Sequence, residues 1–200
     1  MLKMIKGVKI HCANKLNEEY MIDGNSIIAN INADKISKII NDFVDIQKEP
    51  LFLILEIPTN KKNENIKDDI INQTHKDVYY LDNMSISYVK EILNKFGNLF
   101  INDGIAQIGV GNHITNAEIM TSKYNVITLF SGKDKLEKYK ELLEHNNIKQ
   151  VDKLVTAWDF FTKENPGECN SIDEDGKSTY DYIDILTKED GLYFAERRED

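Results

Sequence analysis

The spacing of apolar residues predicts alternating helices and strands along the chain. Between residues 36 and 44 apolar side chains recur at the i, i+3, i+4, i+7 and i+8 positions of one helix face, and Asp34 precedes them as the predicted N-cap. Residues 85–96 repeat this periodicity, with Gly97 as the predicted C-terminal stop. Two further helices are predicted over residues 136–143 and 178–186.

Continuous apolar runs predict the strands. Leu51–Leu55 is too short for a helix and is typical of a central strand covered on both faces. Residues 99–101 and 105–108 flank Asn102-Asp103-Gly104, whose Asp-Gly pair predicts a tight hairpin. Further strands are predicted over residues 78–81, 125–130, 154–161 and 192–195.

The first third of the chain contains two less regular stretches. Residues 1–33 mix apolar and polar positions around the turn Asp23-Gly24-Asn25, which predicts a β-hairpin unit. The polar segment from about 59 to 76 is either a mobile insertion or a short helix built on its isoleucines. Strands separated by helices predict an α+β fold with a mixed, largely antiparallel sheet and three to five helices packed against it. We expect a single globular domain over residues 1–200.

Charge and composition exclude several classes of protein. Lys and Arg total 25 against 34 Asp and Glu, a net charge of −9, which repels nucleic-acid backbones. No stretch approaches the roughly 20 apolar residues of a membrane span, and the first residues carry no apolar run of signal-peptide type. Cys12 and Cys169 lie far apart without a C-x-x-C partner, which favours a reducing cytoplasm. The abundance of Lys, Asn and Ile indicates an AT-rich bacterial genome.

Motifs for cofactors and metals are incomplete. Gly104 and Gly109 have phosphate-loop spacing, but Val110-Gly111 stands where Lys-Ser/Thr is required, and no third glycine completes a dinucleotide fingerprint. Asp173–Gly176 is similar to part of a calcium loop that lacks two ligand positions. The histidines show no metal-binding spacing. We therefore predict neither a metal nor a cofactor.

One histidine lies in an irregular segment suited to lining a cleft. His113 follows Gly111-Asn112 and precedes Glu118, and together with Asp103 it defines the alternative of a hydrolase or metal-dependent enzyme. A structural or surface histidine is favoured, because no Ser or Cys nucleophile is placed beside it. Carboxylates that follow or end predicted strands offer a related acid/base site if they gather on one sheet rim: Glu56, Asp82, Asp103 and Asp159.

Two aromatic or charged segments of the second half leave alternatives open. Trp158 suits a core position, which we favour, or the centre of an interface. Arg197 either forks onto a carboxylate of the fold or belongs to a solvated tail.

Four strings in the second half carry a resemblance to small bacterial proteins. These are Tyr124-Asn125-Val126, Thr156-Ala157-Trp158-Asp159, Asn165-Pro166-Gly167 and Gly191-Leu192-Tyr193-Phe194-Ala195-Glu196-Arg197. The chain thereby resembles uncharacterised proteins of the kind found as toxin-neutralising immunity proteins. The resemblance implies a cytosolic binding protein whose acidic face occludes a toxin, often a basic nuclease. It transfers no residue roles.

We therefore predict a non-enzymatic binding protein, such as an immunity-type inhibitor, that recognises a protein partner. The negative charge would steer a basic partner, and an aromatic residue would anchor the contact. The predicted partner-binding residues are Asp103, Glu118, Trp158 and Asp159.

Overall fold

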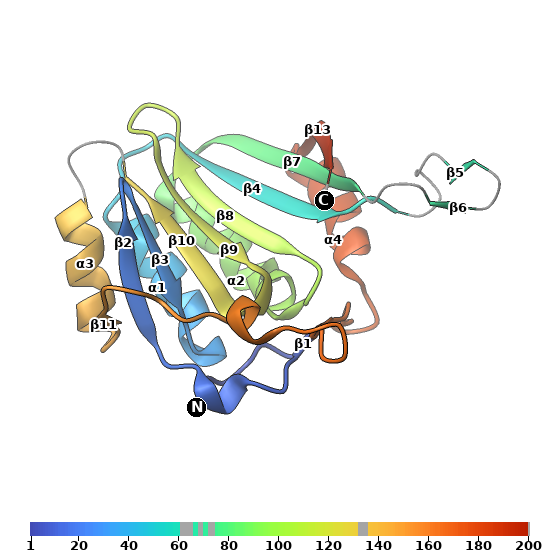
Figure 1. The fold of residues 1–200 in the computed structure, drawn as a ribbon. Helices are drawn as coiled ribbons and strands as arrows, with labels where there is room; N and C mark the ends of the chain where they lie inside the picture. Colours follow the sequence, from blue (N-terminus) through green and yellow to red (C-terminus); the bar gives the residue numbers. More distant parts are fainter. Residues whose placement is uncertain (61–65, 68–69, 72–74, 132–135, 200) are drawn as a thin grey trace.

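The computed structural model describes residues 1–60, 66–67, 70–71, 75–131 and 136–199. Its centre is a nine-stranded sheet in which all neighbouring strands are antiparallel except the first pair (Figure 1). In spatial order the strands are β11 (Lys149–Gln150), β2 (Glu19–Asp23), β3 (Ser26–Asn30), β10 (Val126–Phe130), β9 (Ala117–Ser122), β8 (Gln107–Asn112), β4 (Leu51–Pro58), β7 (His75–Met84) and β13 (Tyr193–Glu199).

Four α-helices occur among the described residues, which confirms the predicted α+β class. They are α1 (Ala33–Asp45), α2 (Ile86–Asn102), α3 (Leu136–His145) and α4 (Thr179–Glu189). Three short 3-10 helices are η1 (Ala13–Lys15), η3 (Lys123–Asn125) and η4 (Ala157–Phe160). Two small strand pairs lie outside the main sheet: β1 (Val8–Lys9) with β12 (Glu168–Cys169), and β5 (Ile66–Lys67) with β6 (Ile70–Ile71). None of the helices in these ranges is both long and apolar enough to cross a membrane.

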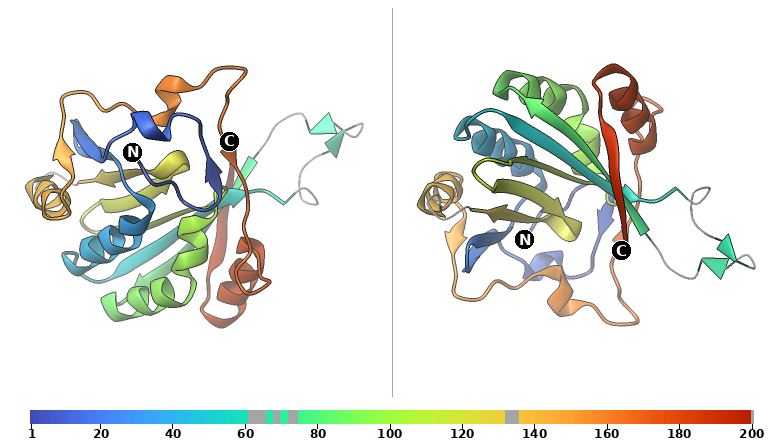
Figure 2. Two further views of the ribbon diagram at one scale, coloured as in Figure 1. Left: turned by 90° about the horizontal axis from the view of Figure 1, so that it is seen from below. Right: turned by 90° about the horizontal axis from the view of Figure 1, so that it is seen from above.

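The helices cover one face of the sheet and leave most of the other without a helix. Both views of Figure 2 show α1 and α2 on one side of the sheet and the chain around residues 151–165 on the other. Cross-strand pairing aligns buried aliphatic side chains in a row on the helix side: Leu53, Val110, Ile119, Leu129 and Ile27. This row packs with α1 and α2 in the main hydrophobic core.

The strongest local patterns correspond to the structure. The apolar residues predicted to form one helix face are the buried side of α1, and β4 lies inside the sheet between β8 and β7. The cap is different from the prediction: Asn32 occupies the N-cap position and Asp34 lies in the first turn.

Two predicted strands are wrong. The hairpin around Asp103 does not form, because α2 continues through Gly97 to Asn102. Burial of Leu99, Phe100 and Ile101 on the helix outweighs the helix penalty of about 1 kcal/mol for one glycine. The strand predicted over 154–161 is instead a loop that contains η4, since the Thr156 and Asp159 side chains form a capping box there.

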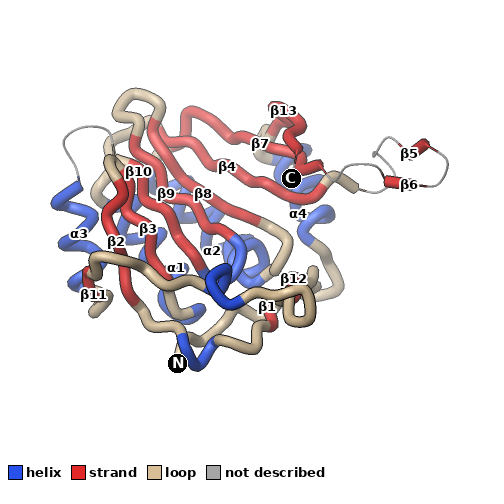
Figure 3. Tube along the Cα trace, in the orientation of Figure 1, coloured by secondary structure: helices blue, strands red, loops and turns tan. Residues whose placement is uncertain are grey.

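Other boundaries move as well (Figure 3). In the expected N-terminal hairpin unit, β2 and β3 pair, but only β1 is a strand within residues 2–11. The short helix considered on Ile66, Ile70 and Ile71 is wrong, since β5 and β6 pair as antiparallel strands. Residues 61–65, 68–69 and 72–74 of the predicted insertion lie outside the described residues. The last strand extends into the charged end as β13.

Candidate functional site: the open face of the sheet

The face of the sheet turned away from α1 and α2 carries aromatic, charged and glycine positions. We call it the open face (the side toward the viewer in Figure 1), and the pairing register identifies its residues strand by strand. Its residues are Phe52, Ile54 and Glu56 on β4; Val78, Tyr80 and Asp82 on β7; Gly109 and Gly111 on β8; Glu118 and Met120 on β9; Phe130 on β10; and Tyr193, Glu196 and Arg198 on β13. Phe52, Ile54 and Val78 form an apolar cluster separate from the main core.

Two glycines allow this surface to be flat. A Cβ placed on Gly111 would lie 2.3 Å from Phe52 Cζ, and one on Gly109 would lie 2.6 Å from Met120 Sδ. Both distances are shorter than real side chains adopt, so the neighbouring side chains lie across β8 because these positions lack a Cβ. The Gly-x-Gly sequence therefore serves packing on the open face.

His113 is held by two contacts at the top of this face. Its Nε2 lies 3.0 Å from Asp82 Oδ1, and Tyr193 donates its hydroxyl to Asp82 Oδ2 at 2.5 Å. The imidazole stacks on Phe52 with ring centroids 4.2 Å apart and planes at 21°. These residues come from the β8–β9 connection and from β7, β13 and β4, yet the His113 side chain is still 65% exposed. The arrangement orients a polar aromatic ring toward solvent.

A small cavity of about 170 Å³ opens beside His113. Glu118 is half-buried in its wall, and both Phe52 and Phe130 line it. Burial raises the pKa of the Glu118 carboxyl, and the charge of Glu56 raises that pKa further, against smaller opposing effects of Arg198 and His113. The cavity thus combines two phenylalanine rings, neighbouring polar side chains and a carboxyl whose ionised form is disfavoured.

The nearby cationic side chains are engaged elsewhere. Arg198 donates from Nη1 to Glu56 Oε1 at 3.0 Å and also pairs with Glu196. Lys76 Nζ lies 3.3 Å from Glu56 Oε2. Within the described ranges Glu118 itself has neither a hydrogen bond nor an ion pair through its side chain. Glu118 is therefore the carboxyl of this cavity that these cations leave without an ion pair.

Asp103 lies apart from this site, which corrects its prediction as a catalytic or partner-binding residue. It is fully buried at the C-cap of α2. Its carboxylate accepts hydrogen bonds from Thr179 Oγ1 at 2.6 Å, Ser171 Oγ at 3.0 Å and the Ile105 amide at 2.9 Å. These bonds join α4 and the preceding loop to the end of α2, so the role of Asp103 is structural.

The proposed rim of carboxylates is only partly assembled. Glu56 and Asp82 both belong to the open face. Asp159 caps η4, where the Thr156 amide donates to it at 2.8 Å, and this backbone hydrogen bond lowers the pKa of its carboxyl. No three His, Cys, Asp or Glu side chains converge on a possible metal position within the part of the chain that the structure describes.

Trp158 is 57% exposed, so the favoured core position is wrong. Its ring contacts Tyr124 edge-on at 4.9 Å and Phe161 at 5.4 Å. The segment that carries it crosses the lower end of the sheet on the open side, where Asn30 Nδ2 donates to Val155 O at 2.8 Å. η4, which carries Trp158 and the exposed Asp159, thus belongs to the segment that crosses the open side at its lower end.

The structure also decides the role of Arg197. Its guanidinium donates two hydrogen bonds to the Asp77 carboxylate, from Nε to Oδ1 at 2.7 Å and from Nη2 to Oδ2 at 3.2 Å, so the solvated-tail alternative is wrong for this residue.

Sequence reasoning missed Phe52, Tyr193 and Phe130 as site residues. The alternation of side chains in β4 offered a partial signal, because every second residue of a strand faces the same side.

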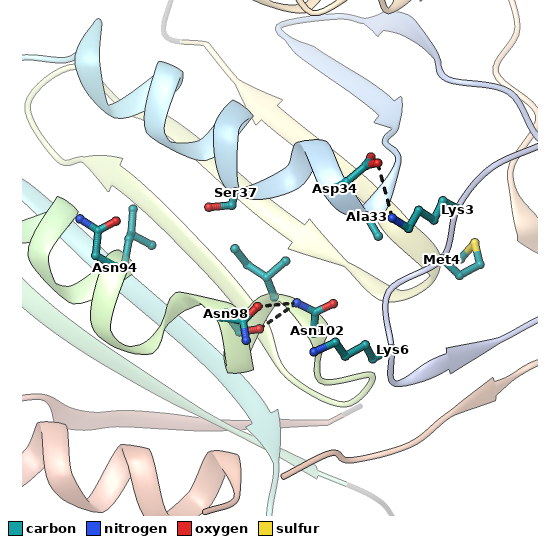
Figure 4. A pocket seen from close by; sticks show the side chains of 11 residues that line it. Lys3, Met4, Lys6, Ala33, Asp34, Ser37, Asn94, Asn98 and Asn102 are labelled. Atoms are coloured by element: carbon teal, nitrogen blue, oxygen red, sulfur yellow. Dashed lines mark hydrogen bonds and ion pairs between the residues drawn. The ribbon is translucent and has the colours of Figure 1, made fainter. Parts of the chain in front are cut away.

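Two larger hollows lie on the helix side. A cavity of about 410 Å³ between α1, α2 and the N-terminal segment is lined by lysine, asparagine and apolar side chains (Figure 4). There Lys3 pairs with Asp34 at 3.6 Å, and Asn102 Nδ2 donates to the Asn98 backbone oxygen at 3.0 Å. A groove of about 540 Å³ runs between α1 and α3. Neither combines an unpaired carboxylate with aromatic walls as the open face does.

The chain matches no protein-family model, and comparisons with curated proteins and with solved structures found no similar protein.

Proposed function

We propose that this chain is a non-enzymatic binding protein that docks a basic protein on its open face, as an immunity-type inhibitor of a bacterial toxin would. The observation that supports this proposal is an aromatic sheet surface without a covering helix, bordered by acidic side chains. Tyr193 and Phe130 are exposed there although both are large and apolar enough to favour burial. Aromatic residues of this kind are enriched at the energetic centres of protein interfaces.

The charge of the face favours a basic partner. Glu56, Asp82, Glu118 and Glu196 contribute four carboxylates, against the cations of Arg198 and of Lys76 at the end of β7. The whole chain adds a net charge of −9. A basic protein would be attracted over roughly the 10 Å Debye length of 0.1 M salt and then oriented by the local charges.

The alternative hydrolase proposal depends on the His113–Asp82 pair. An aspartate that orients a histidine is one part of a nucleophilic site. The other part would be a hydroxyl or thiol bonded to the histidine, and no Ser, Thr or Cys of the described segments hydrogen-bonds His113. With Asp103 also buried elsewhere, binding is the function that the geometry supports better.

A crosslinking experiment tests the binding proposal. A photoreactive phenylalanine analogue replaces Phe130 on the open face, or Ile46, an exposed apolar residue at the end of α1, as the matched control. We expect a basic protein to be crosslinked from position 130 and not from position 46. Once purified, that protein should associate with this chain at least about tenfold more slowly at high salt than at low salt.

Further measurements separate the parts of this proposal. Phe130→Asp should weaken the complex at least about tenfold, whereas Ile46→Asp should leave the affinity unchanged. Equal crosslinking from both positions, or an association rate independent of salt, would reject docking on the open face. If the partner binds but its toxicity in cells is not suppressed, the immunity role fails and binding stands. Hydrolysis of a chromogenic ester that His113→Ala abolishes would support the alternative instead.

A further inference from the structure

We propose that the cavity beside Glu118 receives one arginine side chain of the docked protein, an inference that builds on the proposed function. Its volume is the first reason. At about 170 Å³ the cavity falls below the roughly 300–1,000 Å³ typical of sites for whole small molecules. It is suited to the end of a single side chain.

The register of the sheet explains how residues of several strands meet at the cavity. Phe52, Gly111, Glu118 and Phe130 lie in one cross-strand row on β4, β8, β9 and β10. Because Gly111 has no side chain, the Phe52 ring lies across β8, where a Cβ on Gly111 would be 2.3 Å from Phe52 Cζ. The glycine therefore allows the Phe52 ring to line the same cavity as Glu118.

The chemistry of the walls selects a cation. Glu118 lacks an ionic partner in the described chain, and its neighbours are engaged elsewhere: Arg198 pairs with Glu56 and Glu196, and His113 contacts Asp82. A cation from outside would neutralise Glu118 and reduce its repulsion with Glu56. Burial and that repulsion both raise the pKa of the free carboxyl, as expected for a site that lacks its cation.

The aromatic walls favour arginine over lysine. Phe52 and His113 stack as nearly parallel rings, and Phe130 is directly opposite Glu118 on β10. A guanidinium is planar, stacks on aromatic faces and forms two parallel hydrogen bonds to a carboxylate. The ammonium group of lysine carries the same positive charge but has no planar surface that could stack on an aromatic ring. The cavity therefore fits arginine best.

The test uses small probes, so it does not require the partner. Nα-acetyl-arginine N-methylamide, its lysine counterpart and its neutral citrulline counterpart are titrated into the full chain, and amide NMR shifts are followed around residues 111–118. We expect the arginine probe to bind at least about fivefold more tightly than the citrulline probe, with lysine between them. Glu118→Gln should remove this preference, and Glu91→Gln, an exposed acid on α2, should retain it.

A second variant guards against a purely structural effect. Gly111→Ala keeps the carboxylate, but its Cβ would displace the Phe52 ring that lines the cavity, so it should also remove arginine selectivity. Equal binding of arginine and citrulline, or selectivity that survives in Glu118→Gln, would overturn the inference. If the crosslinked partner still binds Glu118→Gln with full affinity, the inference fails while docking on the open face stands. If no partner crosslinks at position 130, docking fails, and the probe titration still decides the chemistry of the cavity.

Discussion

An ion pair between Arg197 and Asp77 joins β13 to β7 in addition to their backbone pairing. Asp77 is only 5% exposed and accepts from Arg197 Nε at 2.7 Å and from Thr59 Oγ1 at 2.7 Å. β13 is the last strand of the sheet and is exposed along its length, so it has little apolar burial of its own. Arg197→Ala leaves the Asp77 carboxylate buried without this cation.

The expected magnitude follows from the burial of the two partners. Removing one partner of a buried ion pair costs about 3–5 kcal/mol. The Arg197 side chain is 33% exposed, however, and solvent screens part of the interaction. We therefore expect Arg197→Ala to lower the free energy of unfolding by about 2–3 kcal/mol. Arg197→Lys keeps the charge but loses the fork, and should cost about 1 kcal/mol.

Urea denaturation with a matched control measures this effect. Lys38→Ala removes the exposed Lys38–Asp42 pair of α1 and should cost less than about 1 kcal/mol. Hydrogen exchange should show that Arg197→Ala accelerates the β13 amides before those of β4. A loss below about 1 kcal/mol for Arg197→Ala, with unchanged exchange in β13, would refute the reasoning, because the pair would then behave like an exposed one. A double-mutant cycle with Asp77→Ala isolates the coupling energy.

Three further predictions concern the cavity and the buried acid. Glu118→Gln should stabilise the protein at neutral pH. The folded protein raises the pKa of the Glu118 carboxyl, so the wild type loses stability as the pH rises from the ordinary pKa of 4.5 through the folded pKa. Stability curves from pH 3 to 8 that run parallel for variant and wild type would contradict this. Gly111→Ala should cost about 1–3 kcal/mol, since its Cβ displaces the Phe52 ring, and thermal unfolding measures it. Asp103→Ala should cost about 2–4 kcal/mol by leaving buried hydroxyl donors such as Thr179 unpaired, as denaturant unfolding would show; the folded variant should associate with the partner at the wild-type rate, and a slower rate would return Asp103 to the interface.

Local patterns determined the elements whose own residues supply the periodicity. The apolar face of α1 and the continuous run of β4 are visible in the sequence because each is buried through most of its length. Predictions failed where tertiary burial outweighed a local signal. Gly97 and the Asp103-Gly104 pair are strong stop and turn signals, yet the apolar residues between them extend α2 into the core.

The candidate site shows the same division. His113 and Glu118 were visible because they lie five residues apart in a segment with irregular composition. Their partners were not, since Phe52, Asp82 and Tyr193 lie 31 to 80 residues from His113.

The sequence alone thus determined the fold class, the acidic charge, the positions of the main helix and central strand, and two residues of the site. The order of strands decided the rest, because antiparallel pairing brings distant residues opposite one another and local periodicity does not encode which strands become neighbours. That order brought Phe52, Glu118 and Phe130 to one cavity, while the packing of α4 and its preceding loop against the end of α2 buried Asp103.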